Sequence, residues 1–386
     1  MADSTPRKVD VVFFDAGSGH RTAAEALVAA IRLRRPDWRV RSVDLLDILT
    51  GYPLYRWIQR AGVNHFNRML RRDRVTDLRG LIRLCLNLHD RLTPGNIPRI
   101  AAFWAGTPPD VVLSVTPMNN VALGRALRAV NPRGVYATLP VDFEEALPGY
   151  WFNPGEGHRY LLGSERLVQQ AAEAGIPPAA VHALSGMIAH PEAYGPSASP
   201  QDIRAATRRH GLDPDLPAVL VQFGGQGSVL VRDVARALAG SGPRVNLILM
   251  CGRNTRLAQG LRRWNSPVPT LVLGYVPSPL PYRELCTVLV GKPGTMTIAE
   301  AVVAERPLVA VRSAGMHPVQ GGNEAWLRRS GVGVVVDNAQ AVPAAVQGVL
   351  QELDAFRVQI RSHPTRGVFE VAELVDRLTT QQEATA

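Results

Sequence analysis

Short aliphatic and β-branched runs alternate with stretches of helical period along this chain, and this alternation constrains its fold more than any other feature. Strands separated by helices form parallel sheets that the helices cover. In the first half the expected strands are Val9–Ala16, Val40–Leu45, Asp110–Val115, Val135–Leu139, Tyr160–Gly163 and Val181–Leu184. In the second half they are Ala218–Phe223, Asn246–Cys251, Thr270–Leu273, Thr287–Val290, Pro307–Val311 and Gly333–Val336. The pattern predicts an α/β protein of two Rossmann-like, doubly wound parallel-sheet domains that face a central cleft.

A segment rich in Pro, Ser and Gly, His190–Gln201, separates the two sets of strands and is typical of a linker. A chain of 386 residues has room for two domains of ordinary size. We therefore expect an N-terminal domain over residues 1–195 and a C-terminal domain over residues 196–365. Residues 366–386 are expected to form a C-terminal helix that packs back on the first domain.

The charge balance favours an anionic partner. The chain has 43 basic and 33 acidic residues, a net charge of +10, so nucleic acid and anionic lipid both qualify. No run of 18 apolar residues occurs and no signal-peptide core follows the start, which favours a soluble or peripheral cytoplasmic protein. The three cysteines lack metal-ligand spacing, so we expect no disulfide framework and no metal site.

The segment from Tyr55 to Arg91 carries nine arginines and three aspartates, interleaved with large apolar residues. One interpretation is a pair of solvated helices with an ordinary core face. The other is a basic amphipathic surface that lies on an anionic membrane. Under the second interpretation the membrane contacts are Trp57, Arg60, Phe66, Arg68, Arg71 and Arg72.

Glycine-rich turns follow two of the expected strands. The first, Asp15 to His20, contains Gly17 and Gly19 and leads into a strong helix-forming stretch. Such a turn lets a phosphate approach the backbone at a helix N-terminus. It is not a dinucleotide fingerprint, because Thr22 stands where a third glycine is needed. His20 is either a neutral base or a histidine that only hydrogen-bonds locally. The second turn holds Gly225, Gly227 and Ser228.

The third motif contains Lys292, Gly294, Thr295 and Glu300. Thr295 or Thr297 can cap the helix that follows, and Glu300 can bind the two hydroxyls of a ribose. Lys292 and Lys8 are the only lysines among the 43 basic residues. A compact ammonium suits a tight phosphate-binding turn, although Lys292 can equally be an ordinary surface lysine.

The fourth motif, Met316 to Asn323, precedes an expected helix over Glu324–Arg329. The side-chain amides of Gln320 and Asn323 suit the hydroxyls of a sugar. The alternative is that Asn323 simply caps the helix.

In this order and spacing, the motifs GSGHRTAAEAL (17–27), VDF (141–143) before YW (150–151), HRYLLGSERL (158–167), AGIPPAAVHALSGMI (174–188), FGGQGS (223–228), MCGRN (250–254), LGYVPSPLPYREL (273–285), KPGTMTIAEAV (292–302) and QGGN (320–323) resemble those of GT-B glycosyltransferases. The chain is most similar to the group of monogalactosyldiacylglycerol synthases and processive diacylglycerol glucosyltransferases. That group is related to the lipid II-forming N-acetylglucosaminyltransferase of peptidoglycan synthesis. The resemblance implies a GT-B fold whose N-terminal domain serves the acceptor and the membrane side and whose C-terminal domain binds the nucleotide-sugar donor.

The resemblance also implies roles for individual residues. His20 and Asp142 become the catalytic candidates, near the acceptor hydroxyl or the diphosphate. The donor would be bound by Gly17, Gly19, Gly225, Gly227, Ser228, Gly252, Arg253, Tyr275, Val276, Lys292, Gly294, Thr295, Glu300, Gln320 and Asn323. Within this set, Gly252–Arg253 and Tyr275–Val276 are assigned to uracil and Glu300 to ribose. Gln320 and Asn323 are assigned to the sugar.

Two departures from the family's pattern leave the acceptor and the sugar open. In the family a histidine usually follows the aspartate that corresponds to Asp142, and this chain has none there. The segment 143–149 is also longer than the family's usual segment. The acidic residue usually found beside the sugar is also missing from residues 318–323.

These observations predict an inverting, metal-independent transfer of a hexose from a UDP-sugar co-substrate to a diacylglycerol-like lipid hydroxyl, at the inner face of the cell membrane and without a cofactor. One alternative keeps the fold and replaces the lipid by a soluble natural product or a saccharide. Another is a basic nucleic-acid or nucleotide-binding module. No recognised nucleic-acid motif accompanies the arginines, so we expect no nucleic-acid partner. The oligomeric state is left open.

Overall fold

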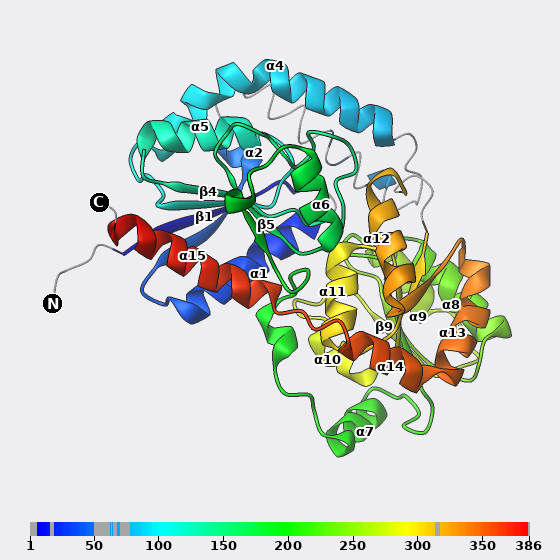
Figure 1. The fold of residues 1–386 in the computed structure, drawn as a ribbon. Coiled ribbons are helices and arrows are strands. Elements are labelled where there is room, and N and C mark those ends of the chain that lie inside the picture. Colours follow the sequence, from blue (N-terminus) through cyan, green and yellow to red (C-terminus); the bar gives the residue numbers. More distant parts are fainter. Residues whose placement is uncertain are drawn as a thin grey trace. The chain divides into compact units, whose positions relative to one another are not determined.

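The computed structural model describes residues 6–15, 19–49, 62, 64, 68–69, 78–312 and 317–384. These residues divide into two compact units (Figure 1). The first contains residues up to 49, 78–191 and 365–384, and the second contains residues 192–364. The unit boundaries, after Pro191 and Pro364, lie within a few residues of the predicted ones.

The first unit is built on a six-stranded parallel sheet of order β2-β1-β3-β4-β5-β6. Its strands are β1 (Lys8–Phe13), β2 (Arg39–Asp44), β3 (Val111–Ser114), β4 (Val135–Thr138), β5 (Arg159–Leu162) and β6 (Val181–Ala183). Its helices are α1 (Gly19–Arg34), α2 (Leu45–Ile48), α4 (Leu78–Trp104), α5 (Asn120–Val130), α6 (Glu165–Glu173) and α15 (Gly367–Ala384), with a 3₁₀ turn, η1, at Pro178–Ala180.

Helices cover the first sheet on both faces, which explains why its central strands β3 and β4 are buried at every residue, whereas the edge strand β2 carries exposed polar residues. On one face α4 and α5 pack over the strands, with Trp104 and Leu123 fully buried in that core (Figure 1). On the other face α1 lies beside α15 (Figure 1).

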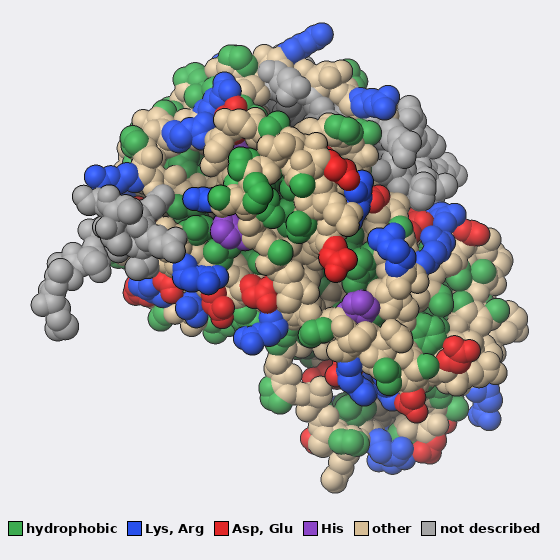
Figure 2. Space-filling view, in the orientation of Figure 1, with side chains coloured by type: hydrophobic (Ala, Val, Ile, Leu, Met, Phe, Trp, Pro, Cys, Tyr) green, Lys and Arg blue, Asp and Glu red, His purple; other side chains and the backbone are tan. Residues whose placement is uncertain are grey.

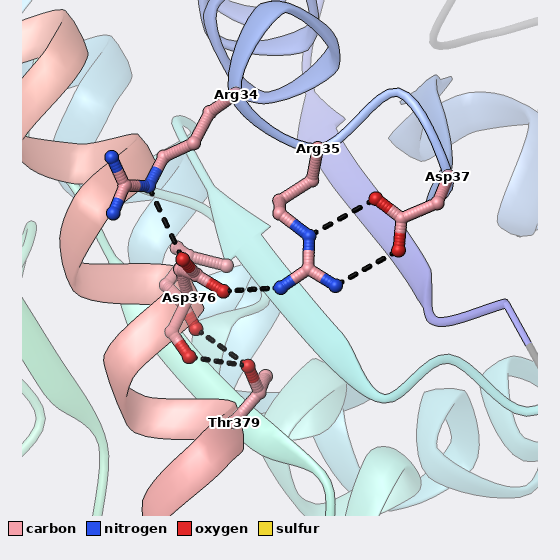
Figure 3. A network of polar contacts seen from close by, with 6 residues as sticks. Arg34, Arg35, Asp37, Asp376 and Thr379 are labelled. Atoms are coloured by element: carbon pink, nitrogen blue, oxygen red, sulfur yellow. Dashed lines mark hydrogen bonds and ion pairs between the residues drawn. The ribbon is translucent and has the colours of Figure 1, made fainter. Parts of the chain in front are cut away.

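A small ion-pair network ties α15 to the end of α1 (Figure 3). Arg35 Nη1 donates to Asp376 Oδ1 at 2.7 Å, and Arg34 Nε donates to Asp376 Oδ2 at 3.2 Å. Arg35 also donates to both carboxylate oxygens of Asp37. The last helix of the chain therefore belongs to the first unit.

The second unit repeats the design with a parallel sheet of order β12-β11-β10-β7-β8-β9. Its strands are β7 (Ala218–Gln222), β8 (Asn246–Met250), β9 (Thr270–Leu273), β10 (Val288–Gly291), β11 (Leu308–Val311) and β12 (Gly333–Val336). Its helices are α7 (Pro200–Arg209), α8 (Leu230–Ser241), α9 (Thr255–Arg262), α10 (Leu280–Leu285), α11 (Thr295–Val303), α12 (His317–Ser330), α13 (Val342–Gln351) and α14 (Leu353–Arg361), with 3₁₀ turns at Pro191–Tyr194 (η2) and Ala339–Ala341 (η4). Helices α8, α9 and α13 share one core with the strands.

All twelve predicted strands are present, so the predicted fold of two parallel-sheet units is confirmed. Each sheet reverses its strand order once, between β1 and β3 in the first unit and between β7 and β10 in the second. The ends of β7, β8 and β10 are in register, because Gln222 pairs with both Met250 and Gly291. In open α/β sheets ligands bind at the carboxyl ends of strands beside such a reversal.

One local prediction differs from the structure. Helix α12 begins at His317 rather than Glu324, so Gly321 and Gly322 lie inside its first turns. The C-terminal part of the arginine-rich segment 55–91 lies in α4, which continues to Trp104 through Pro94 and Pro98. Most of residues 55–77 lie outside the described part of the chain.

Candidate active site

His20 stands in the first turn of α1, at the strand-order reversal of the first sheet. Its Nδ1 lies 2.6 Å from the carbonyl oxygen of Val115, the residue that follows β3. A carbonyl oxygen only accepts, so Nδ1 carries the proton and donates. In the neutral ring Nε2 is then the basic nitrogen, which is the arrangement a general base needs.

Asp142 and His20 share a neighbour, Trp151. The indole Nε1 of Trp151 donates to Asp142 Oδ2 at 3.3 Å, and the Trp151 ring lies 6.4 Å from the His20 ring, centre to centre. Burial raises the pKa of Asp142 to about 7, and the hydrogen bond from Trp151 opposes that rise. We call His20, Asp142 and Trp151 the N-terminal cluster.

Glu145 stabilises the loop between Asp142 and Trp151. Its Oε1 accepts hydrogen bonds from the backbone N–H groups of Trp151 and Phe152. The amide of Gln170 on α6 bonds both the N–H and the carbonyl of Glu145. Glu145 therefore holds Trp151 in position against the aspartate.

The turn after β1 is only partly described, and Gly17 lies outside the described residues. Gly19 begins α1 and has open space where a side chain would project. Next to it, Arg21 donates to both oxygens of Asp15, from Nε at 3.0 Å and from Nη2 at 2.6 Å. This bidentate pair fixes the beginning of α1, and with it the position of His20.

In the second unit, the loops that follow β7 and β8 interlock. Gly227 has φ +75°, and a Cβ added there would lie 1.9 Å from the carbonyl oxygen of Cys251. Gly252 has φ +51°, and a Cβ there would lie 2.4 Å from the carbonyl oxygen of Gly225. Only glycine fits at these two positions. Ser228 is buried, and its Oγ accepts a weak hydrogen bond of 3.3 Å from the N–H of Leu230.

Lys292 extends from the end of β10 towards the same loops. A Cβ built on Gly224 would lie 3.7 Å from both Cε and Nζ of Lys292. The lysine is half-buried, and burial lowers the pKa of its ammonium. The ammonium of Lys292 has no hydrogen bond or ion pair with any residue that the structure describes. A positive charge without a counterion at this position is suited to an anion.

Helix α11 begins immediately after this lysine. Its N-cap is Gly294, which has no side chain to cap the helix. Neither Thr295 nor Thr297, the two threonines predicted to cap α11, is its N-cap. The first N–H groups of α11 therefore remain available to a bound anion. Lys292 Nζ, the α11 N-terminus and the Gly224–Ser228 loop form what we call the C-terminal cluster.

The predicted ribose and sugar residues surround this cluster. The carboxylate of Glu300 accepts from Nη2 of Arg283, and both side chains are almost fully buried. Asn323 donates to the carbonyl of Pro293 and to the hydroxyl of Thr295, which holds the turn after Lys292 in place. Gln320 is buried, and its Oε1 has no hydrogen-bond partner among the described residues.

The predicted uracil residues lie at the ends of β8 and β9. The backbone N–H of Arg253 donates to the carbonyl of Gly225 at 2.9 Å. Its guanidinium lies 4.8 Å from the centre of the Tyr275 ring, and that ring is 56% exposed. The adjacent Val276 is half-buried. The pair of Arg253 and Tyr275 presents a flat surface beside the interlocked loops.

Of the predicted membrane residues, only Arg68 lies among the described ones, and it is exposed; Trp57, Arg60, Phe66, Arg71 and Arg72 fall outside them. No helix in the described part of the chain is long and apolar enough to cross a membrane. Within the same residues no three His, Cys, Asp or Glu side chains lie close enough to share a metal ion.

Sequence reasoning did not assign roles to Trp151, Glu145, Arg283 or the carbonyl of Val115. Trp151 and Arg283 lie within or beside motifs that carry the family resemblance, which was the available signal. Their partners, Asp142 and Glu300, are 9 and 17 residues away in the sequence, and no local pattern links them.

Comparison with known proteins defines the class. Residues 218–378 match the model of the glycosyltransferase family 28 C-terminal domain. MurG of Acinetobacter baumannii has the same fold, with a TM-score of 0.59 and 13% identity, covering 96% of this chain and 99% of that one. The spinosyn rhamnosyltransferase SpnG has a TM-score of 0.60 at 13% identity, covering 97% of this chain and all of that one. The protein is therefore of the GT-B glycosyltransferase fold.

The chain is also similar to curated monogalactosyldiacylglycerol synthases. The probable monogalactosyldiacylglycerol synthase of Glycine max is 28% identical over 318 residues, which cover 79% of this chain and 58% of the relative. The chain thus spans less than two thirds of that relative's length. The predicted resemblance to the monogalactosyldiacylglycerol synthase group is confirmed.

Proposed function

We propose that the protein transfers a hexose from a UDP-sugar to the hydroxyl of a diacylglycerol-like lipid, with inversion at the anomeric carbon and without a metal ion. The observation that carries this proposal is Lys292. It is a half-buried ammonium without a partner among the described residues, set beside a glycine loop and the N-terminus of α11. A nucleoside diphosphate supplies the negative charge that this arrangement lacks.

The C-terminal cluster would bind the donor. The Lys292 ammonium and the N–H groups that begin α11 contact the diphosphate, and the charge that develops on the departing UDP is stabilised by these fixed donors. The surface formed by Arg253 and Tyr275 is the proposed place for the base, and Gln320 the proposed contact of the sugar. The Lys292 ammonium and these N–H groups then stabilise the diphosphate charge, which a divalent cation stabilises in other transferases.

The N-terminal cluster would activate the acceptor. The lipid hydroxyl gives its proton to His20 Nε2 while its oxygen attacks the anomeric carbon. The bond from that carbon to the diphosphate oxygen breaks, and UDP leaves with the electron pair. A positioned base of this kind typically contributes about 10²- to 10⁴-fold. Asp142, whose pKa burial raises to about 7, is the second candidate for the base.

The lipid acceptor is proposed from the relatives, which are named for the synthesis of monogalactosyldiacylglycerol. Contact with an anionic membrane at the cytoplasmic face is consistent with the net charge of +10. Helix α4 is proposed to contribute to it, because Arg83, Leu84 and Arg91 are all exposed. On the face drawn in Figure 2, by contrast, basic and acidic side chains are interspersed.

The proposal is tested by a donor screen. Purified protein is mixed with UDP-glucose, UDP-galactose or UDP-N-acetylglucosamine and with diacylglycerol in vesicles that contain anionic or only neutral lipid. We expect UDP release with one donor, faster on anionic vesicles and unchanged by EDTA. Release that needs a soluble sugar or natural product instead of the lipid would overturn the lipid acceptor. Loss of activity in EDTA would overturn metal independence.

A further inference from the structure

Arg283 and Glu300 form a buried ion pair in the second unit, beside the C-terminal cluster. Arg283 comes from α10 and Glu300 from the second turn of α11, and their side chains are 6% and 10% exposed. Removing two charges from water is costly unless their geometry is good and their remaining atoms are hydrogen-bonded. Buried pairs of this kind are therefore expected to use every donor and acceptor they have.

This pair does not. A single hydrogen bond joins Arg283 Nη2 to Glu300 Oε2. Nε of Arg283 is buried without a hydrogen-bond partner, and Glu300 Oε1 accepts no hydrogen bond from the described residues. Several other ion pairs among the described residues are bidentate and use both carboxylate oxygens, for example Arg21 with Asp15 and the buried Asp10 with Arg41.

The one-sided geometry keeps a carboxylate oxygen for another donor. Arg283 lies in α10, and its neighbour Tyr282 packs on His210 at the end of α7, with ring centres 5.6 Å apart. Glu300 lies in the second turn of α11, near the helix N-terminus that we assign to the diphosphate. The group nearest to a diphosphate in any nucleotide donor is its ribose, whose hydroxyls are hydrogen-bond donors.

We propose that Arg283 is a positioning residue that engages Oε2 of Glu300 and directs Oε1 to the ribose hydroxyls, so that the protein prefers ribonucleotides over 2′-deoxyribonucleotides. The inference rests on the proposed function of the C-terminal cluster as a donor site. A hydrogen bond from a hydroxyl to an ionised carboxylate corresponds to a discrimination of about 10- to 100-fold.

The test compares the affinities of UDP and 2′-deoxy-UDP by calorimetry. Wild-type protein should bind UDP about tenfold or more tightly than the deoxy form. Arg283→Met should weaken UDP and reduce the ratio towards one, since Glu300 is no longer held, and Arg283→Lys should recover part of the ratio. If Arg283→Met does not fold, Arg283→Met combined with Glu300→Leu removes both buried charges and the acceptor oxygen, and should bind the two nucleotides equally.

Arg41→Met is the matched control, because it removes the arginine that forms an ion pair with the buried Asp10 in the other unit. It should lower thermal stability and leave the nucleotide ratio unchanged. A ratio in Arg283→Met equal to that of wild type, with UDP binding intact, would overturn the role of Arg283 alone. Absence of UDP binding by wild-type protein would overturn the donor site itself, and this inference with it.

Discussion

The Nδ1 atom of His20 and the carbonyl oxygen of Val115 are 2.6 Å apart, although 95 residues separate them in the sequence. The bond joins the turn after β1 to the end of β3, the two neighbouring strands between which the sheet order reverses. It fixes both the ring orientation and the tautomer of His20. The second unit has its counterpart in Lys292, at the reversal between β7 and β10.

Replacing His20 tests whether its basic nitrogen takes part in the chemistry. His20→Asn keeps an N–H group that can donate to Val115 but has no base at the position of Nε2. We expect kcat to fall by about 10²- to 10⁴-fold, with the Kd for UDP within twofold of wild type. Steady-state kinetics and calorimetry provide the two values. Activity retained within a few-fold would remove His20 from the reaction and leave Asp142 as the base.

Asp142 predicts a pH dependence of stability. Burial raises its pKa from 3.8 to about 7 in the folded protein, so its contribution to stability is present below about pH 4 and is lost as the pH rises through 7. Asp142→Asn carries no such charge. The variant should therefore gain stability relative to wild type between about pH 4 and pH 8. Urea unfolding across this range checks the sign, with Glu144→Gln as control. A constant difference at all pH values would contradict the burial of the charge.

Lys292 predicts proton uptake on donor binding. Burial holds its pKa below the ordinary value of 10.5 in the free protein, and a bound diphosphate favours the charged form. In alkaline buffer, between the lowered pKa and 10.5, UDP binding should take up protons. Calorimetry in two buffers of different ionisation enthalpy measures this uptake. Lys292→Arg stays charged throughout, so it should bind without uptake, and Lys292→Met should bind weakly. Uptake that persists in both variants would exclude Lys292 as its source.

Gly227 should not tolerate a side chain. Its φ is +75°, and an added Cβ would lie 1.9 Å from the Cys251 carbonyl, so Gly227→Ala must push the β7 and β8 loops apart. We expect a lower Tm and loss of UDP binding. Gly260 in α9 has no atom within 4 Å of an added Cβ, and Gly260→Ala should stabilise by about 0.5 to 1 kcal/mol. Equal Tm values for the two variants would show that the loops do not interlock.

The regular part of this fold could be predicted because strand runs and glycine turns are local patterns. The start of α12 could not, since Gly321 and Gly322 are poor helix formers. The next residue, Asn323, holds both glycines in the helix, because its side-chain amide donates to the carbonyl of Pro293 and to the hydroxyl of Thr295. The arrangement of the site was hidden for the same reason. Glu300 was assigned from its motif, but the arginine that occupies one of its oxygens comes from a different helix.

The central claim, hexose transfer to a lipid, is tested most directly by following the sugar. Protein is incubated with labelled UDP-hexose and diacylglycerol in anionic vesicles, and the lipid phase is extracted and analysed by mass spectrometry. We predict one labelled glycosyl-diacylglycerol with inverted anomeric configuration, formed by wild type and reduced at least about 10²-fold in His20→Asn. Label that remains entirely in the aqueous phase with UDP-glucose, UDP-galactose and UDP-N-acetylglucosamine would contradict the account.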